Sequence, residues 1–234
     1  ELKLQIEMEG GFVTSRRVDK HVYMVARHTP EIPGLIRYPS TQEEIEENKV
    51  LLRDLTAAEV LPTVLINGES SLLVEADDCL FMDKTNEQAS ARYGFPVMTF
   101  VIAVDLESES MLGASCYMGS VSGVYASENA IYLTQAEGYD EESRTLLHSF
   151  KASDDLTYQG SGSVDGHLWS RGEVDFRISE HAGYLRVVTT TQTGPWGSED
   201  SIDHQLSVLQ RSNQELALNL VETLPNANRP EKIG

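Results

Sequence analysis

The sequence has few basic residues, only two cysteines and no long hydrophobic run. Its 234 residues include 18 Lys and Arg against 37 Asp and Glu, a formal net charge of −19 at pH 7. Nucleic acids and anionic membranes are disfavoured as partners, because both are bound through a cationic surface. No segment approaches the roughly 20 apolar residues of a membrane-spanning helix. The sequence therefore predicts no transmembrane segment in this chain.

Both ends of the chain lack features of a finished protein. It begins at Glu1, without an initiator methionine or a basic stretch leading into an apolar run, and it ends in the turn-forming segment 224–234. We expect a targeting segment upstream of Glu1 and further structure after the last residue.

Alternating apolar and polar residues dominate the chain, with 40% hydrophobic and 24% charged residues overall. Alternation at period two is typical of half-buried strands. Turn-forming sequences such as Asn67-Gly68 separate the strand-like segments. These segments lie at 2–8, 22–25, 95–104, 130–134, 146–150, 185–191, 206–209 and 216–221. The pattern predicts an all-β fold: a sandwich, a barrel or a propeller.

One segment has the pattern of a helix. Thr41 and Glu44 form a capping-box motif, and apolar residues at helical spacing follow over about 42–55. A second such motif, Thr56 to Glu59, predicts one further turn before Pro62. We predict a helical insertion at residues 39–62, with helix near 41–61, that decorates the surface and covers a sheet edge.

A weak internal repeat distinguishes between these three kinds of β fold. Val22, Ile131 and Leu185 occupy equivalent places in three segments in which a turn precedes an apolar strand. Val22 and Ile131 are 109 residues apart, whereas Ile131 and Leu185 are 54 apart. A period near 50 residues is typical of propeller blades of about four strands. The longer interval could hold two blades, or one blade with the helical insertion. We predict a partial β-propeller of about four blades over residues 1–234.

Four segments resemble a known family. They are 124–133 (VYASENAIYL), 147–150 (LHSF), 160–166 (GSGSVDG) and 176–190 (FRISEHAGYLRVVTT). Together they are similar to the bacterial and archaeal secreted beta propeller domain family. The resemblance implies export to the cell envelope, a lipid anchor upstream of Glu1, and a chain that is the N-terminal portion of a larger propeller. It implies no activity that could be assigned to particular residues.

The last of these segments contains four residues that we interpret as structural. Gly183 follows a turn that needs an unusual backbone angle. Glu180 and Arg186 flank this turn, so we expect a local ion pair between them, and Leu185 is expected to face the same layer as Val187. A structural turn is favoured over a ligand-binding role for this motif.

The resemblance also bears on the two cysteines, Cys79 and Cys116. Exported proteins commonly contain disulfides, so the implied export favours a Cys79–Cys116 bond. The alternative is two buried, unpaired thiols.

Sequence motifs of catalysis are absent. Residues 119–123 do not have the spacing of a nucleophile elbow, and the glycine-rich run 160–166 misses the dinucleotide fingerprint by one residue. We interpret this run as blade turns. The six histidines lack metal-ligand spacing; they are His21, His28, His148, His167, His181 and His204. The sequence thus predicts no catalytic residue, no cofactor and no metal site.

Two further groups of residues could bind ligands. Adjacent carboxylates could hold calcium, although solvated turns are the favoured interpretation; they are Asp77-Asp78, Asp140-Glu141-Glu142, Asp154-Asp155 and Glu199-Asp200. Aromatic residues in or near loops could bind a sugar or a peptide, or pack between blades; they are Tyr139, Tyr158, Trp169 and Trp196.

Two functional hypotheses remain. The favoured one is an exported, non-enzymatic propeller that acts as a binding or scaffold module for an envelope protein, peptide or glycan. The alternative is an envelope hydrolase or oxidoreductase with its site at the channel mouth. The alternative expects histidines from several blades to converge with carboxylates.

Overall fold

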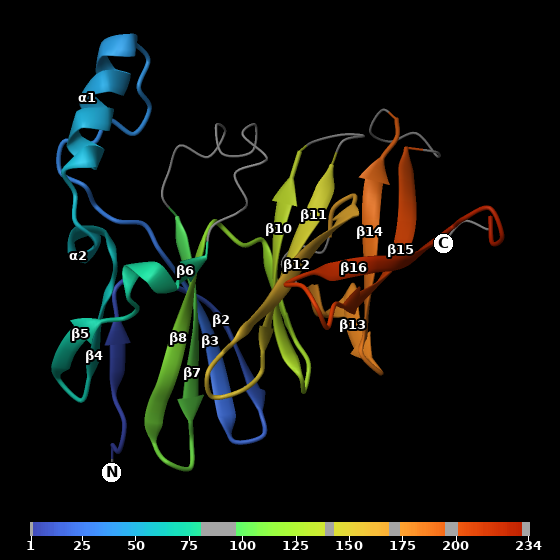
Figure 1. Cartoon of the computed structure of the whole chain (residues 1–234), viewed down its shortest axis with the longest axis horizontal. Coiled ribbons are helices and arrows are strands. Elements are labelled where there is room, and N and C mark those ends of the chain that lie inside the picture. The colour runs from blue at the N-terminus through green and yellow to red at the C-terminus, as the bar shows by residue number, and fades with distance from the viewer. Residues whose placement is uncertain (1, 81–96, 139–142, 169–173, 195–200, 231–234) are drawn as a thin grey trace. The chain divides into compact units, whose positions relative to one another are not determined.

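The computed structural model describes residues 2–80, 97–138, 143–168, 174–194 and 201–230, and most of its elements are strands (Figure 1). The chain divides into two compact units, Glu1–Ser120 and Val121–Gly234. The sheets of both units are mainly antiparallel, which confirms the all-β prediction. None of the helices in the described ranges has the length and apolar character of a membrane span.

The first unit contains one large sheet and one small sheet. The large sheet has the order β2-β3-β7-β8-β6, and its pairs are antiparallel except β6 with β8. Its strands are β2 (Gly11–Val18), β3 (His21–His28), β7 (Met98–Asp105), β8 (Ser110–Met118) and β6 (Cys79–Leu80). The small sheet comprises β1 (Ile6–Met8), β4 (Thr63–Ile66) and β5 (Glu69–Leu72).

The helices lie where the capping motifs predict them. Helix α1 spans Gln42–Arg53, and its capping box joins Thr41 to Glu44. Helix α2 spans Ala57–Val60, with the Glu59 carboxylate accepting from the Thr56 amide at 2.8 Å. Both belong to a longer excursion between β3 and β7 that also contains β4, β5, the short 3₁₀ helix η1 (Ala76–Asp78) and β6. The insertion is therefore larger than the predicted 39–62.

This insertion covers a sheet face and not merely an edge. Residues 98, 100, 102 and 104 of β7 share one face, and all four belong to a buried cluster with side chains of the insertion. The members from the insertion are Leu61, Val64, Leu73, Val74 and Cys79. The segment after the helices therefore supplies half of the residues of this buried cluster, whereas α1 itself buries no residue.

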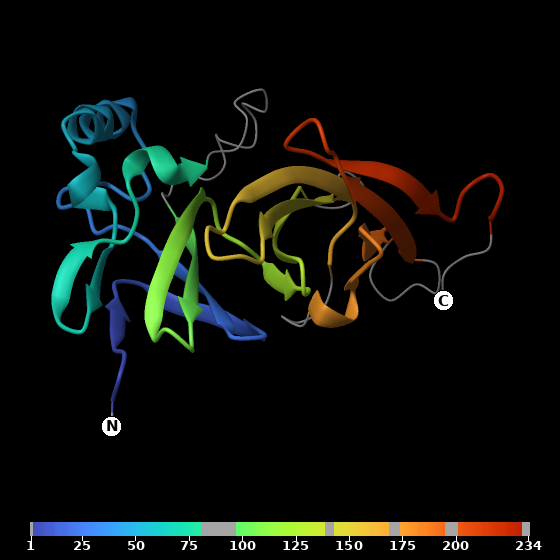
Figure 2. The same ribbon diagram turned by 60° about the horizontal axis from the view of Figure 1, so that its bottom comes forward.

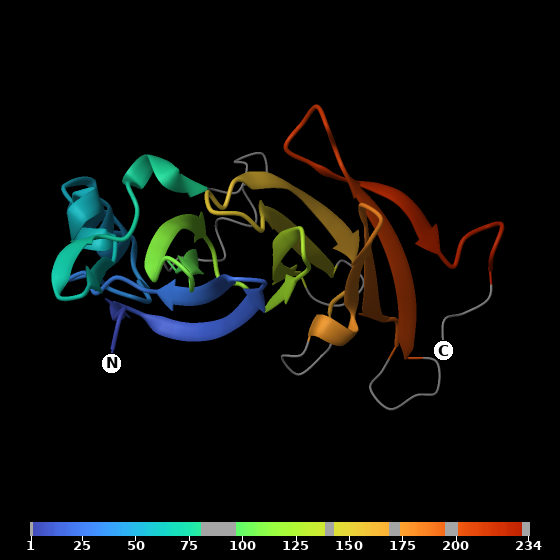
Figure 3. The ribbon, with the colours of Figure 1, turned by 90° about the horizontal axis from the view of Figure 1, so that it is seen from below.

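The second unit contains two four-stranded sheets, each made of four consecutive strands (Figures 2 and 3). The first comprises β9 (Gly123–Ala126), β10 (Ala130–Glu137), β11 (Arg144–Lys151) and β12 (Tyr158–Asp165). A 3₁₀ helix, η3 (Val174–Phe176), leads to the second, which comprises β13 (Ile178–His181), β14 (Tyr184–Gln192), β15 (Ile202–Arg211) and β16 (Leu218–Leu224). One buried cluster includes side chains of both sheets, so their facing surfaces form the core.

The internal repeat corresponds to equivalent strands. Val22 lies in β3, Ile131 in β10 and Leu185 in β14, and each of these is the second strand of its ladder. The doubled interval between Val22 and Ile131 is explained by the insertion between β3 and β7. Of the four sheets, three thus contain the repeated ladder, and the small fourth sheet joins β1 to the insertion.

Candidate functional site

The segment with the most specific resemblance forms a tight hairpin. Strands β13 and β14 are joined by Ala182 (φ 51°) and Gly183 (φ +80°), two residues in the left-handed region. Positive φ at both central positions is the geometry of a type I′ turn, which matches the twist of paired strands. Leu185 and Val187 both enter the buried cluster between the two sheets, at 1% and 0% exposure.

The expected ion pair between Glu180 and Arg186 does not form. In the hairpin register Glu180 lies opposite Leu185, while Arg186 lies opposite Ser179. Directly opposed residues share a face and successive residues alternate, so Glu180 and Arg186 point to opposite faces. The predicted ion pair was wrong because it was based on the proximity of both residues to the turn and did not take this alternation into account.

Glu180 instead contacts the neighbouring sheet. Its Oε2 accepts hydrogen bonds from Ser127 Oγ at 2.5 Å and from Tyr132 Oη at 3.0 Å. Its backbone amide donates to Tyr125 Oη at 3.1 Å. The partners precede Glu180 by 48 to 55 residues, so no local pattern could have indicated them. One carboxylate and one amide of β13 therefore link this strand to the β9–β10 hairpin.

The Tyr132 phenol is held in its protonated form. Burial and, secondarily, the Glu180 carboxylate raise the pKa of Tyr132 to about 12, against an opposing hydrogen bond from Arg211. The Tyr125 and Tyr132 rings stack with centroids 6.0 Å apart. A phenol with this pKa is a hydrogen-bond donor at neutral pH, so it suits a structural contact better than proton transfer.

The glycine-rich run 160–166 lies mostly within β12, so its interpretation as blade turns is wrong. Gly166 alone follows the strand, and its positive backbone angle (φ +81°) is typical of a turn. A Cβ on Gly160 (φ +128°) would lie 2.3 Å from the backbone nitrogen of Ala217. A Cβ on Gly162 would lie 2.4 Å from the carbonyl oxygen of Leu218. The Ser161 amide donates to the Leu216 carbonyl at 3.3 Å. Glycines here allow β12 and the backbone around β16 to approach one another closely.

Four histidines belong to the second unit, and each has a different environment. His148 lies in the middle of β11 at 5% exposure, and burial lowers its pKa to about 4. The His167 backbone exchanges two hydrogen bonds of 2.9 Å with Thr190, whose hydroxyl lies 2.9 Å from His204 Nδ1. His181 is exposed beside the tight turn. Over the described ranges, no group of three or more His, Cys, Asp or Glu side chains is arranged to hold a metal ion.

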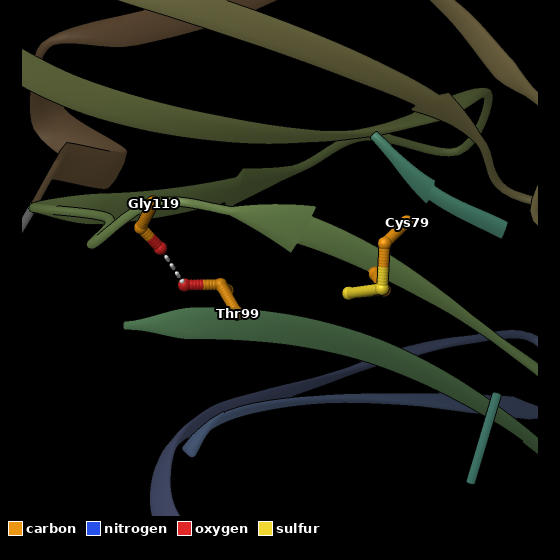
Figure 4. Close-up of a disulfide and its surroundings, with 4 residues drawn as sticks. Cys79, Thr99 and Gly119 are labelled. Carbon is orange, nitrogen blue, oxygen red and sulfur yellow. Dashed lines mark hydrogen bonds between the residues drawn. A yellow bond between two sulfur atoms is a disulfide. The ribbon is translucent and has the colours of Figure 1, made fainter. Parts of the chain in front are cut away.

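A disulfide links the insertion to the large sheet of the first unit. Cys79 of β6 and Cys116 of β8 are directly paired in the parallel register, with their Cα atoms 4.4 Å apart (Figure 4). Both belong to the buried cluster, at 9% and 0% exposure. On the adjacent strand, Thr99 Oγ1 donates to the Gly119 carbonyl at 2.7 Å. The bond therefore fixes the short edge strand β6 against its neighbour.

The repeated ladder agrees with a comparison against known protein families. Residues 1–234 match the family model of the beta propeller domain. The chain belongs to the beta propeller domain family. No curated protein matches the chain. The four-stranded ladders of the second unit and the ladder β2-β3-β7-β8 are accordingly blades of a propeller.

The blade formed by β13–β16 has a second apolar face. Val188 lies opposite Leu206, which in turn lies opposite Leu224, so the three side chains form a row across three strands. This row lies on the face opposite to Leu185 and Val187, and its members are half-buried. The register shows that β14 and β15 have apolar side chains on both faces, as a strand between two blades requires.

The candidate ligand groups of the sequence have ordinary structural surroundings where they are described. Asp155 Oδ1 and Oδ2 each accept from a hydroxyl at 2.5 Å, from Ser153 and Thr157, which lowers the pKa of this carboxyl to about 2. Asp77 and Asp78 are exposed in η1. Tyr158 packs edge-on against Phe150. Tyr139, Trp169, Trp196, the acidic run 140–142 and Glu199-Asp200 lie outside the described residues.

Proposed function

We propose that this propeller chain acts as a non-enzymatic binding or scaffold module of the cell envelope, and that helix α1 is its contact surface. The observation that carries this proposal is the exposure of α1. Its twelve residues include no buried side chain, while Val50 is 57% and Leu52 46% exposed. In Figure 1 the helix projects from the strands of its own unit.

A helix of this length needs a packing partner. Isolated helices shorter than about 12–15 residues are marginal in water, and helices in proteins are stabilised mainly by burying an apolar face. The Asn48 side chain joins the helix to the segment before it: its amide oxygen accepts from the Ile36 backbone amide at 2.9 Å, and its amide nitrogen donates to the Ile36 carbonyl at 2.8 Å. An interaction partner would supply the apolar contacts that the fold leaves unmade.

The envelope location is supported by the disulfide. A buried Cys79–Cys116 bond suits an oxidising compartment, because cytosolic thiols are kept reduced. Fractionation of the producing cell, with thiols alkylated before lysis, tests this part. Recovery in the envelope fraction with both cysteines protected is expected, whereas a cytosolic protein with two alkylated thiols would contradict export.

Site-specific photo-crosslinking tests the binding role. A photo-reactive residue at position 50 is expected to give one defined adduct in producing cells. The control is the same residue at position 12, where Phe12 is 70% exposed on β2 of the same unit. Adducts at both positions, or at neither, would contradict a specific contact through α1.

We further propose that residues 1–234 are part of a larger propeller. The row Val188, Leu206 and Leu224 is suited to pack against another blade, as the opposite face of the same sheet does. A half-buried apolar row of this kind is suited to a further contact. A photo-reactive residue at position 206 in the natural protein is expected to crosslink to a part of the same polypeptide outside residues 1–234. Adducts only with other proteins would contradict this arrangement.

A further inference from the structure

The turn between β4 and β5 contains the only Asn-Gly sequence of the chain. Asn67 (φ 52°) and Gly68 (φ 90°) both have positive backbone angles, and the residues on either side of them, Ile66 and Glu69, are paired. This is the geometry of a two-residue type I′ turn, which favours asparagine followed by glycine. Both turn residues are exposed. The dipeptide that suits this turn is also one that is chemically labile in water.

An asparagine before glycine loses its side-chain amide in a reaction that needs only water. The backbone nitrogen of Gly68 attacks Cγ of Asn67, a five-membered imide closes, the Cγ–Nδ2 bond breaks, and ammonia leaves with the proton of the Gly68 amide. Water then opens the imide at either carbonyl, which gives aspartate or isoaspartate. Glycine favours the attack because no Cβ shields its nitrogen. At Gly68 the surroundings are open, since a Cβ there would meet no atom within 4 Å.

The folded turn holds the reacting atoms apart. In a type I′ turn the first central residue has a ψ of about 30°. At this angle the Gly68 nitrogen lies nearly anti to Cβ of Asn67 about the Cα–C bond, so the imide ring cannot close. The side chain is also held on the side of β1: Asn67 Oδ1 accepts from the Gln5 amide at 3.0 Å, and the Asn67 amide donates to the Gln5 carbonyl at 2.9 Å. Reaction at Asn67 therefore requires the hairpin to open.

We propose that Asn67 is a site of deamidation and isoaspartate formation that the fold protects and that reacts when the β4–β5 hairpin opens. Isoaspartate adds a carbon atom to the backbone of a turn that has no room for it, so Ile66 and Glu69 lose their pairing. Val64 of β4 is 2% exposed and belongs to the buried cluster that the insertion forms with β7. The modification therefore records an opening of the small sheet and weakens the cover of β7 afterwards.

Incubation of the whole chain at neutral pH, in buffer and in urea, tests this proposal. Mass spectrometry of the proteolytic peptide that contains residue 67 distinguishes amide from acid, and chromatography separates aspartate from isoaspartate. The other asparagines, none of which precedes glycine, are internal controls. Gln5→Pro removes the backbone amide that donates to Asn67, whereas the matched control Gln5→Ala keeps it. Gly68→Ala is measured in urea, where the backbone angle of the folded turn has no influence.

We expect conversion at residue 67 to be at least about tenfold slower in buffer than in urea, because only the open hairpin reacts. Gln5→Pro should speed conversion in buffer about threefold, as the loss of one hydrogen bond predicts, and Gln5→Ala should leave it unchanged. Gly68→Ala should slow conversion in urea about tenfold, because its Cβ shields the attacking nitrogen. Equal rates in buffer and urea, equal rates for the two Gln5 variants, or conversion of Gly68→Ala at the wild-type rate would each overturn the proposal.

Discussion

The two units cover their sheets in different ways. In the first, one face of the blade is covered by the insertion between β3 and β7, and a disulfide fixes the last strand of that insertion to β8. In the second, each blade covers the other without an inserted segment or a cysteine. Close backbone approach at Gly160 and the polar contacts of Glu180 join the two blades.

This difference indicates which contacts are optional in a blade. The four-stranded ladder recurs in both units, so its formation does not depend on a particular covering element. The insertion adds a long loop, whose closure reduces the entropy of the chain, and the disulfide offsets part of that cost by restricting the unfolded state. The second unit avoids this cost, but the contact between its blades depends on the close backbone approach at Gly160 and on the hydrogen bonds of Glu180. The predictions below test each side of this comparison.

Removal of the disulfide is expected to have the largest effect. Replacing Cys79 and Cys116 with Ala should lower the free energy of unfolding by about 4 kcal/mol, the value expected for a closed loop of this length. Hydrogen exchange measured by segment should show the loss in β6, β7 and β8. Strands β10 and β11 should keep their protection and serve as the internal control. Equal loss in both units would contradict separate stabilisation.

The glycine contact should give the next largest effect, now confined to the second unit. Gly160→Ala places a Cβ 2.3 Å from the Ala217 nitrogen at φ +128°, and backbone atoms cannot move aside cheaply. We expect a loss of about 3 kcal/mol in urea unfolding. Gly183→Ala is the matched control, because its φ is +80° but no atom lies within 4 Å; it should cost about 1 kcal/mol. Similar losses for both variants would mean that backbone strain and not close approach determines stability.

The sequence predicts the local features of this fold well. Both capping boxes occur at the predicted residues, because a cap depends on groups within one helical turn. The repeat positions Val22, Ile131 and Leu185 correspond to equivalent strands, because each strand alternates in the same way around a buried layer. The family that four segments of the sequence resemble is also the family whose model the chain matches.

Features that depend on distant contacts could not be predicted. Glu180 was paired with Arg186 by proximity, whereas its partners Ser127 and Tyr132 lie on another sheet. The run around Gly160 looked like turns, because the backbone of Leu216 that it approaches is more than fifty residues away. The sequence of an insertion does not indicate which sheet face the insertion covers. The contribution of the segment after α2 to the buried cluster was therefore not predicted.

Acidification should weaken the second unit through His148. Burial lowers the pKa of His148 to about 4, below the value of 6.5 in the unfolded chain. The unfolded chain therefore takes up this proton first as the pH falls, and stability is lost between pH 6.5 and about 4. At pH 5 the loss should be about 2 kcal/mol relative to pH 7. Guanidinium unfolding of His148→Asn should show a flatter pH dependence than wild type. The exposed His181→Asn should match wild type, and parallel curves for all three proteins would contradict this role.

The Glu180 contact should give the smallest effect on stability and the most specific one. Glu180→Ala removes the carboxylate that accepts from the half-buried Ser127 and the buried Tyr132, which should cost about 1–2 kcal/mol. Glu180→Gln keeps an oxygen at this place and should cost less.

The two variants should act alike on the Tyr132 phenol, because both remove the charge that opposes its ionisation. Its pKa should fall below about 12, yet stay above the ordinary value of 10, because burial is the larger cause of the shift. Ultraviolet titration of the phenolate measures this change, with Tyr132→Phe to assign the signal. A tyrosine titration unchanged in both variants would mean that Glu180 supports the hairpin alone, and that the two blades of the second unit are joined by apolar packing and close glycine contact without this polar link.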